Sequence, residues 1–520
     1  MKVNPILLEV FKNRFSSISE EMGVTLTRTA FSPNIKERRD LSCAVFDREG
    51  NMIAQAAHIP VHLGSMPMSV KSAIDAHPFR EGDMVMLNDP FKGGTHLPDI
   101  TIVAPVFAGQ ETPRFYVANR AHHADVGGMS SGSMPLSTSL FQEGIIIPPL
   151  KIVEKGRIDR KIMGFLLNNV RTPSEREGDF SAQIMANITG VRRTEELIKK
   201  YTVETVEFYA QNLMSYAEQV TRKAVKGIPD GTYTFQDFMD DDGLAAEKIR
   251  VHVAITVKGD EAVLDFRKSD LQVRGSINGV YAITLSAVLY VFRSLVDMDI
   301  PTNAGCLRPV KVITKDGTVV DAEFPAAVAG GNVELSQRIV DVILGALSNA
   351  MPEKIPAASQ GTMNNVTIGG IDPRTGRPFA YYETIGGGMG ASAKGHGESA
   401  VHCHMTNTMN TPIEALEYSY PLLVREYSIR RGSGGPGKHR GGDGIIREIQ
   451  TLSDAEVTVL SERRKIAPYG LFGGRPGTPG KNIIIRAGKR EDRPGKFFAS
   501  LKKGDVLRIE TPGGGAYGAE

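Results

Sequence analysis

The sequence predicts an α+β protein of several domains, built mainly from antiparallel sheets, with long helices and a β-rich C-terminal region. Apolar residues recur at helical spacing near the N-terminus and again over residues 178–226. Elsewhere, short apolar or alternating runs are separated by turn residues, and glycine becomes frequent after about residue 425. At about 150 residues per domain, the length of 520 residues fits three domains. We expect them at 1–227, 228–424 and 425–520.

Four segments carry the helical pattern. The first helix is expected to begin at Pro5 with Asn4 as its N-cap, because proline is favoured at the first helical position. Residues 178–226 have apolar positions at threes and fours, which predicts one or two long helices. Residues 282–296 and 336–351 are apolar with few charges, which is typical of helices packed on most sides.

Two hairpins are predicted in the first domain. Residues 41–46 form an apolar run that is followed by a turn at 47–51 and a second strand. Residues 100–107 and 114–120 flank the turn sequence GQETP in the same way. Further strands are expected at 251–257 and 262–266 and in the C-terminal runs AEVTVLSE, KNIIIRAG and DVLRIETP.

Composition excludes several classes of protein. There are 61 basic and 59 acidic residues, so the formal charge of +2 gives no general attraction to nucleic acid or to an anionic membrane. No run of about 20 apolar residues is free of charges, and Glu9 and Lys12 interrupt any signal peptide. Cys43, Cys306 and Cys403 are too scattered for a disulfide framework. We expect a cytoplasmic protein.

The second hairpin brings together a candidate metal site. Antiparallel strands return to where they began, so His96 and Asp99, at the start of the first strand, should face His122 and His123, with Asp125 nearby. Imidazole nitrogens and carboxylate oxygens together suit zinc or manganese. The alternative is two unrelated loops whose histidines cap strands, and the spacing alone does not decide between the two.

Two other polar groups are candidates for a site. Asp40 follows Arg38 and Arg39 directly before an apolar run, so its carboxylate is expected to be buried with a partner, most simply in a salt bridge with Arg39. His402 and His404 alternate around a cysteine, which would place both on one face of a strand. The two histidines would then form either an ordinary polar face of the strand or a second pair of metal ligands, for which no third ligand can be identified.

The glycine-rich tracts at 385–397, 430–444 and 511–518 do not predict a nucleotide site. Gly432, Gly437 and Lys438 match the phosphate-loop spacing, but His439 replaces the expected Ser or Thr. A strand, and not a helix, is expected to follow this tract. Glycines here are better explained as bends that let backbones pack closely. The arginine–glycine tract lacks aromatic residues for stacking on RNA, so we expect no nucleic-acid partner.

Six tracts occur in one order along the chain: ERRDLSCAVFD (37–47), NDPFKGGTHLPDI (88–100), RAHHADVGG (120–128), TNTMNTPIEALE (406–417), GSGGPGKHRGGDGIIRE (432–448) and the terminal TPGGGAYG. Together they resemble the hydantoinase B family. This family includes the B-type part of 5-oxoprolinase and subunits of N-methylhydantoinase, caprolactamase, and acetone and acetophenone carboxylases. The resemblance spans nearly the whole chain.

The resemblance implies a divalent metal, zinc as first choice and manganese as second, held by Asp40, His96, Asp99 and His122. It therefore replaces the salt bridge as the role of Asp40 and selects His122 over His123. Asp125 would fix the tautomer of a ligand histidine by accepting its second N–H. His123 or Asp125 would act as the catalytic base.

The function implied by the resemblance is that of the catalytic B-type subunit of an ATP-dependent cyclic amidase. A partner, the hydantoinase A-type ATPase subunit, would bind ATP and activate the ring amide, in an (αβ)2 heterotetramer. The metal would then assist hydrolysis of a hydantoin, 5-oxoproline or a lactam. The alternative is an ATP-dependent ketone carboxylase of the acetone or acetophenone type, which would use the same ligands.

Overall fold

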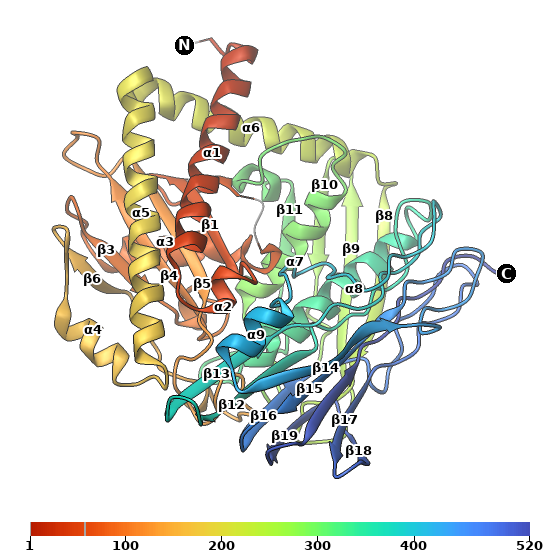
Figure 1. The fold of residues 1–520 in the computed structure, drawn as a ribbon. Helices are drawn as coiled ribbons and strands as arrows, with labels where there is room; N and C mark the ends of the chain where they lie inside the picture. The colour runs from red at the N-terminus through yellow and green to blue at the C-terminus, as the bar shows by residue number, and fades with distance from the viewer. Residues whose placement is uncertain (1, 57–58) are drawn as a thin grey trace.

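Mixed helices and antiparallel sheets make up the computed structural model, which describes residues 2–56 and 59–520 and confirms the predicted α+β class (Figure 1). The α-helices among these residues are α1 (Pro5–Thr29), α2 (Pro33–Lys36), α3 (Ser65–Ala76), α4 (Arg160–Leu167), α5 (Pro173–Tyr201), α6 (Val203–Lys226), α7 (Tyr281–Ser294), α8 (Ser336–Ser348) and α9 (Ile413–Ser419). Within the described ranges, no helix is both long enough and apolar enough to cross a bilayer.

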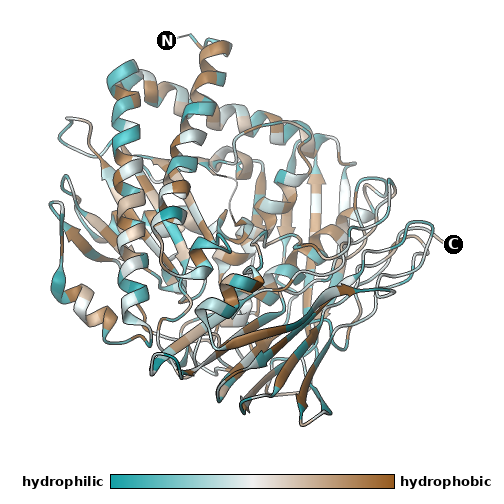
Figure 2. Ribbon diagram, viewed as in Figure 1, coloured by the Kyte–Doolittle hydropathy of each residue, from teal (hydrophilic) through white to brown (hydrophobic). Residues whose placement is uncertain are grey.

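The first helix begins as predicted. Pro5 is its first residue, and the Asn4 side chain accepts hydrogen bonds from the backbone N–H groups of Ile6 and Leu7, which satisfies two donors that a helix start leaves open. One face of α1 is buried and the other is exposed. Hydrophobic and hydrophilic residues accordingly alternate along α1 and α5 (Figure 2). The predicted helical stretch 178–226 forms two helices, which are divided at Thr202.

A seven-stranded antiparallel sheet carries both predicted hairpins, β1 with β2 and β4 with β5. Helices α1 and α5 cover one face of this sheet, and α3 packs on the other face through Met66, Val70 and Ala73. Both faces are therefore buried, which explains why its strands are apolar runs without alternation. Its strands in order are β2 (Met52–Gln55), β1 (Leu41–Asp47), β5 (Phe115–His122), β4 (Asp99–Val106), β3 (Met84–Leu87), β6 (Leu150–Glu154) and β7 (Arg157–Ile158).

A second, four-stranded sheet packs against α8, the predicted apolar helix near residue 340. Helix α7 lies beside α8, and a single π-helical turn, Gly331–Leu335, leads directly into α8. The apolar side chains of this region join those of the first sheet in one continuous core. The strands in order are β11 (Val310–Ile313), β10 (Glu261–Asp265), β9 (Ile249–Lys258) and β8 (Gly231–Met239).

The C-terminal region is β-rich, as predicted, and consists of two sheets that share a core of their own. Residue 228 lies in the connection between α6 and β8, whereas residue 425 lies inside β14. The division into three domains stays a prediction. One sheet has the order β13 (Arg377–Glu383), β12 (Asn365–Asp372), β16 (Ala455–Leu460), β19 (Lys496–Leu501), and the other β14 (Leu422–Arg430), β15 (Gly444–Thr451), β20 (Val506–Glu510), β17 (Lys481–Arg486), β18 (Lys489–Arg493).

The three glycine-rich tracts run beside one another as extended chains joined by backbone hydrogen bonds. Gly388 N–H donates to Pro512 O, Gly442 N–H to Met389 O, and Gly514 N–H to Gly442 O. The close backbone packing expected of these glycines is therefore present. Strand β15 follows the tract at 430–444, as predicted. The three cysteines are buried, and no disulfide joins them.

Candidate metal centre

The β4–β5 hairpin places three candidate ligands together, as predicted. Asp99 begins β4 and His122 ends β5, and the two residues are partners in the strand register. His96 lies one turn before β4, with its Nε2 3.2 Å from His122 Nδ1 and 3.3 Å from Asp99 Oδ2. The three residues are buried, and each offers a ligand atom within 4.8 Å of the others.

Two atoms of this group are buried and form no hydrogen bond with any residue that the structure describes: Asp99 Oδ1 and His122 Nε2. An unsatisfied buried polar atom costs about 1–3 kcal/mol, and an unsatisfied carboxylate oxygen costs more. A divalent cation would satisfy them, and the mixed nitrogen and oxygen donors suit zinc or manganese. The residues present therefore fit the expected metal.

Asp40 lies beside this group without being one of the three. Its backbone oxygen accepts a hydrogen bond from His122 N–H at 3.0 Å, and its side chain lines the same small cavity as Asp99 and His122. That cavity has a volume of about 20 Å³, room for roughly one water-sized ligand. The cation nearest to the Asp40 carboxylate is Arg38 at 4.0 Å, and not Arg39 as the salt-bridge alternative required.

The side chains of His123 and Asp125 point away from the candidate ligands, and their catalytic roles stay predictions. Successive side chains of a strand face opposite sides, so His123 turns away from His122 toward α5, where its Nε2 lies 2.9 Å from Gln183 Oε1. Burial lowers the pKa of His123 to about 4. Asp125 accepts hydrogen bonds from the backbone N–H and the guanidinium of Arg171 at 2.8 and 2.9 Å. Among the described contacts, neither side chain bonds to a candidate ligand.

The tautomer of His96 is fixed by the backbone instead. His96 Nδ1 lies 3.3 Å from the carbonyl oxygen of Ala329, so Nδ1 carries the proton and Nε2 presents its lone pair to the group. The side-chain amide of Asn332, from the π-helical turn, donates to this Nε2 at 3.0 Å. An incoming metal ion would replace that hydrogen bond.

His62 is a third imidazole at the site, beside His96 and His122, and the sequence did not predict it. Its Nε2 lies 3.2 Å from Asp99 Oδ2, and its Nδ1 lies 2.9 Å from Ser42 Oγ. His62 ends a short 3-10 turn, and Asn332 lies 270 positions further along the chain. No spacing motif connects either residue with the β4–β5 hairpin, so only the tertiary fold reveals them.

The pKa shifts of Asp99 and His122 favour the protonation states that bind a cation. Burial raises the pKa of Asp99, but the neighbouring His96 and His62 outweigh burial and hold that pKa well below its usual range. Burial also lowers the pKa of His122. Asp99 is therefore ionised and His122 neutral near pH 7, which are the forms that bind metal. The Tyr382 ring stacks on His122 with centroids 4.3 Å apart and holds its orientation.

Comparison with known proteins identifies the family. The family model for hydantoinase B/oxoprolinase matches residues 4–520. The chain belongs to the hydantoinase B/oxoprolinase family.

Several relatives in the hydantoinase B/oxoprolinase family resemble the chain over its length. It is 41% identical to 5-oxoprolinase of Dictyostelium discoideum over 99% of this chain, but spans only 40% of that relative. It is 30% identical to the putative B-type subunit of a D-/L-hydantoinase of Pseudomonas sp., over 99% of this chain and 90% of that protein. A relative of unassigned function in Methanocaldococcus jannaschii is 41% identical, over 99% of this chain and 91% of that protein.

Two solved structures share the fold. The ATP-dependent caprolactamase from Pseudomonas jessenii has a TM-score of 0.93 at 29% identity, over 100% of this chain and 92% of that chain. An acetone carboxylase has a TM-score of 0.92 at 19% identity, over 99% of this chain and 76% of that chain, which is a likeness of fold alone.

In this member of the hydantoinase B/oxoprolinase family, His402 and His404 do not lie on one face of a strand. Residues 402–404 lie outside the strands, and His404 has a left-handed backbone with φ 57°, so the predicted shared strand face is wrong. His404 Nε2 lies 3.9 Å from Asp341 Oδ1. His402 is buried, and burial lowers its pKa to about 4.

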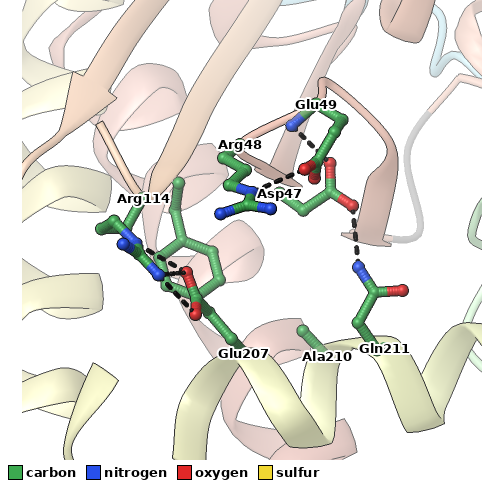
Figure 3. A pocket seen from close by; sticks show the side chains of 8 residues that line it. Asp47, Arg48, Glu49, Arg114, Glu207, Ala210 and Gln211 are labelled. Carbon is green, nitrogen blue, oxygen red and sulfur yellow. Dashed lines mark hydrogen bonds and ion pairs between the residues drawn. The ribbon is translucent and has the colours of Figure 1, made fainter. Parts of the chain in front are cut away.

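A larger surface pocket of about 160 Å³ lies at the other end of β1 and β5 (Figure 3). There Arg114 binds Glu207 of α6 through two hydrogen bonds of 2.7 Å, and Asp47 accepts a hydrogen bond from Gln211. Register pairs Asp47 with Phe115 at this end, whereas residues 41 and 121 pair near the candidate metal centre. Its charged groups already bind one another, so this pocket is not the candidate centre.

Proposed function

We propose that this chain is the catalytic B-type subunit of an ATP-dependent cyclic amidase. It would open a hydantoin, 5-oxoproline or lactam ring by hydrolysis of the C–N bond. The observation that carries the proposal is the convergence of His96, Asp99 and His122 in a buried group with two unsatisfied ligand atoms. The names of the 5-oxoprolinase, hydantoinase and caprolactamase relatives supply the reaction class.

His96, Asp99 and His122 would hold the metal, with Asp40 as the fourth ligand. The ion, when bound, polarises the ring carbonyl as a Lewis acid and makes a water nucleophilic near neutral pH. The protein's own task is to keep Asp99 ionised and oriented. His62 and the hydroxyl of Thr95 both contact Asp99 Oδ2. With His123 and Asp125 turned away, His62 is the imidazole that lines the cavity beside the candidate ligand His122.

Activation of the ring amide is proposed to come from a hydantoinase A-type ATPase subunit, in an (αβ)2 heterotetramer. Transfer of a phosphoryl group to the amide oxygen would make the ring carbon attackable by water. Departure of the ring nitrogen as the amine would then break the C–N bond and leave an acyl phosphate, which a second water would hydrolyse to the carboxylate and phosphate. The name of the Pseudomonas sp. relative, which describes one subunit of a hydantoinase, supports a partner. The tract that partly matches a phosphate loop supports the same assignment, because its glycines pack against other glycine backbones.

The decisive assay uses the chain purified together with its partner subunit. Ring opening of hydantoin, 5-oxoproline and caprolactam is measured with and without ATP, and acetone with bicarbonate tests the carboxylase alternative. We expect ATP-dependent opening of at least one ring amide and no carboxylation. Carboxylation of acetone without ring opening would overturn the proposal.

Replacement of His96 tests the metal centre. We expect His96→Ala to lower bound zinc or manganese at least tenfold by elemental analysis and to abolish turnover, because one of the converging ligands is gone. His123→Gln is the matched control: its side chain faces α5, so the metal content of the folded variant should stay at the wild-type level. Full metal content and activity in His96→Ala would reject the site.

A further inference from the structure

Both ring nitrogens of the candidate ligand His96 contact one segment of the chain, residues 328–335. The carbonyl oxygen of Ala329 accepts the Nδ1 proton at 3.3 Å, and the side-chain amide of Asn332 donates to Nε2 at 3.0 Å. A metal ion bound at Nε2 would replace the amide, so the contact with Ala329 is the one that persists when the centre is loaded. The position of this carbonyl group therefore sets the orientation of the imidazole.

The segment that holds His96 is the start of a helical run. Residues 329 and 330 are helical, and the run continues through the π-helical turn Gly331–Leu335 into α8. The first N–H groups of a helix have no acceptor within the helix, and the helix dipole places partial positive charge at this end. The N–H groups of residues 328 and 329 therefore need an acceptor from elsewhere in the fold.

Glu143 supplies that acceptor. Its Oε1 accepts hydrogen bonds from the backbone N–H groups of Val328 at 2.9 Å and Ala329 at 3.0 Å, and from the hydroxyl group of Ser137 at 2.6 Å. Glu143 is fully buried. One carboxyl oxygen thus caps the helical run at the residue whose carbonyl oxygen contacts His96.

A buried carboxyl group in this position is costly. The three donors that bind Glu143 in the described part of the chain carry no charge, and its second oxygen, Oε2, forms no hydrogen bond there. Burying a carboxylate without a cation costs free energy of folding, and burial raises the pKa of Glu143 to about 7. Groups with such shifts concentrate at functional sites.

We propose that Glu143 is a positioning residue of the candidate metal centre, which holds His96 through the backbone of residues 328 and 329. The carboxyl group fixes the two N–H groups, and the carbonyl oxygen of Ala329 in turn fixes the Nδ1 proton of the imidazole. Nε2 is thereby held toward the other candidate ligands with its lone pair free. This inference rests on the metal centre of the proposed function and adds a residue to it.

Two substitutions separate the reach of the Glu143 side chain from its charge. Glu143→Gln keeps the length of the side chain and an acceptor oxygen. Glu143→Asp keeps the carboxyl group but is shorter by one methylene group, so it cannot keep both hydrogen bonds to the N–H groups. Positioning depends on reach, so Glu143→Gln should behave as the wild type and Glu143→Asp should not.

The affinity for metal is the readout, measured by chelator competition on the chain purified together with its partner subunit. We expect the dissociation constants for zinc and manganese to rise about tenfold in Glu143→Asp, the lower end of the loss that outer partners of metal ligands cause. In Glu143→Gln they should equal those of the wild type. The absorption spectrum of bound cobalt reports ligand geometry, and it should change in Glu143→Asp alone.

Glu462→Asp is the matched control. Glu462 is also buried and accepts a hydrogen bond from the backbone N–H of Asp240 at 2.8 Å, but no described hydrogen bond joins it to a candidate ligand. The control loses the same methylene group, so it should lower the midpoint of urea unfolding and leave the metal affinity unchanged. An equal loss of affinity in Glu462→Asp and Glu143→Asp would overturn the proposal, because general destabilisation would then explain both.

Other outcomes also decide against positioning. Weaker metal binding by Glu143→Gln, whether or not Glu143→Asp shares it, would assign the role to the negative charge. Wild-type affinity and cobalt spectra in both variants would show that His96 does not depend on Glu143. If Glu143→Asp fails to fold, Ser137→Ala takes its place, because it removes the third hydrogen bond to Oε1: weaker metal binding supports the proposal, and unchanged binding overturns it.

The tautomer of His96 separates failure of the proposal from failure of the proposed function. If the wild type binds neither metal, the metal centre is wrong, and nitrogen NMR of the metal-free protein with isotope-labelled histidine decides the role of Glu143 alone. The His96 signals are assigned by their loss in His96→Ala. A proton on Nδ1 in the wild type and Glu143→Gln, but a mixture of tautomers in Glu143→Asp, supports positioning. The same tautomer in all three proteins overturns it.

Discussion

His402 illustrates how a single buried side chain sets the pH range of stability. Burial lowers its pKa from 6.5 to about 4, and the nearby Arg38 acts in the same direction. The unfolded chain therefore binds a proton on this histidine between pH 6.5 and 4, whereas the folded chain does not. Stability rises with pH wherever the unfolded state binds more protons. His402 thus favours folding above pH 6.5, and this contribution is lost as the pH falls toward 4.

We expect His402→Gln to flatten this pH dependence. The midpoint of urea unfolding should drop less between about pH 7 and about pH 4.5 in the variant than in the wild type, because the residue that titrates only in the unfolded chain is absent. His396→Gln serves as control, since His396 is exposed, and it should keep the wild-type slope. A slope in His402→Gln equal to that of the wild type would contradict the assignment.

Only some residues of the candidate metal centre could be predicted from the sequence. His96, Asp99 and His122 followed from one hairpin, because strand register is a local property that turn residues and apolar runs indicate. His62, the third imidazole, and the amide of the π-helical turn did not, because their contacts with this hairpin depend on how distant segments pack. The orientation of His123 and Asp125, away from this group, did not follow either, because adjacency in the sequence does not tell which side chains meet the site.

At the scale of elements, the glycine-rich tracts depend on backbone-to-backbone contact. A Cβ atom on Gly441 would collide with the carbonyl oxygen of Gly514 and lie 2.5 Å from its carbon, and neither atom belongs to a flexible side chain. We expect Gly441→Ala to lower the free energy of unfolding by about 1–3 kcal/mol, the usual cost of overpacking.

Gly395→Ala is the control for Gly441→Ala. A Cβ on Gly395 meets nothing within 4 Å, and its φ is not positive. Thermal unfolding of both variants distinguishes the two cases: Gly395→Ala should melt with the wild type, and Gly441→Ala should melt lower. Identical melting of the two variants would show that the tracts tolerate side chains, contrary to the packing described.

Elements with local signals were predicted, and elements held by distant contacts were not. The cap of α1, the two hairpins and the apolar helices α7 and α8 each follow from neighbouring residues. The close packing of glycine tracts was expected, but their alignment joins residues more than 100 positions apart, such as Gly388 and Pro512. The π-helical turn Gly331–Leu335 had no signal in the sequence, although it supplies Asn332 to the candidate centre.

At the scale of the whole molecule, one core runs through residues from all three expected domains. It extends from Phe11 to Leu460 and includes apolar residues from the second sheet and from the face of the first sheet that α1 and α5 cover. A buried network of charged side chains also connects these regions. Arg463, just after β16, contacts Asp237 of β8 at 2.7 Å and Asp341 of α8 at 2.6 Å. Arg463 therefore joins the C-terminal region to the central sheet and its helix.

The carboxylates of this network depend on two arginines. Burial raises the pKa of Asp237, but Arg463 and then Arg338 outweigh burial and hold that pKa below its usual value. Without Arg463, both Asp237 and Asp341 would depend on Arg338, which lies 3.2 Å from the first and 3.9 Å from the second. Loss of Arg463 would thus leave two buried carboxylates with one shared cation.

We expect Arg463→Met to destabilise the protein by about 3–5 kcal/mol, the range for removal of one partner from a buried ion pair. Guanidinium denaturation followed by circular dichroism measures the change. Arg48→Met is the control, because Arg48 pairs with Glu49 and both side chains are exposed, and such surface pairs contribute about 1 kcal/mol or less. Equal destabilisation by the two variants would refute a joining role for Arg463. The loss of stability would then follow from removing any paired arginine, and not from the position of Arg463 between the C-terminal region and the central sheet.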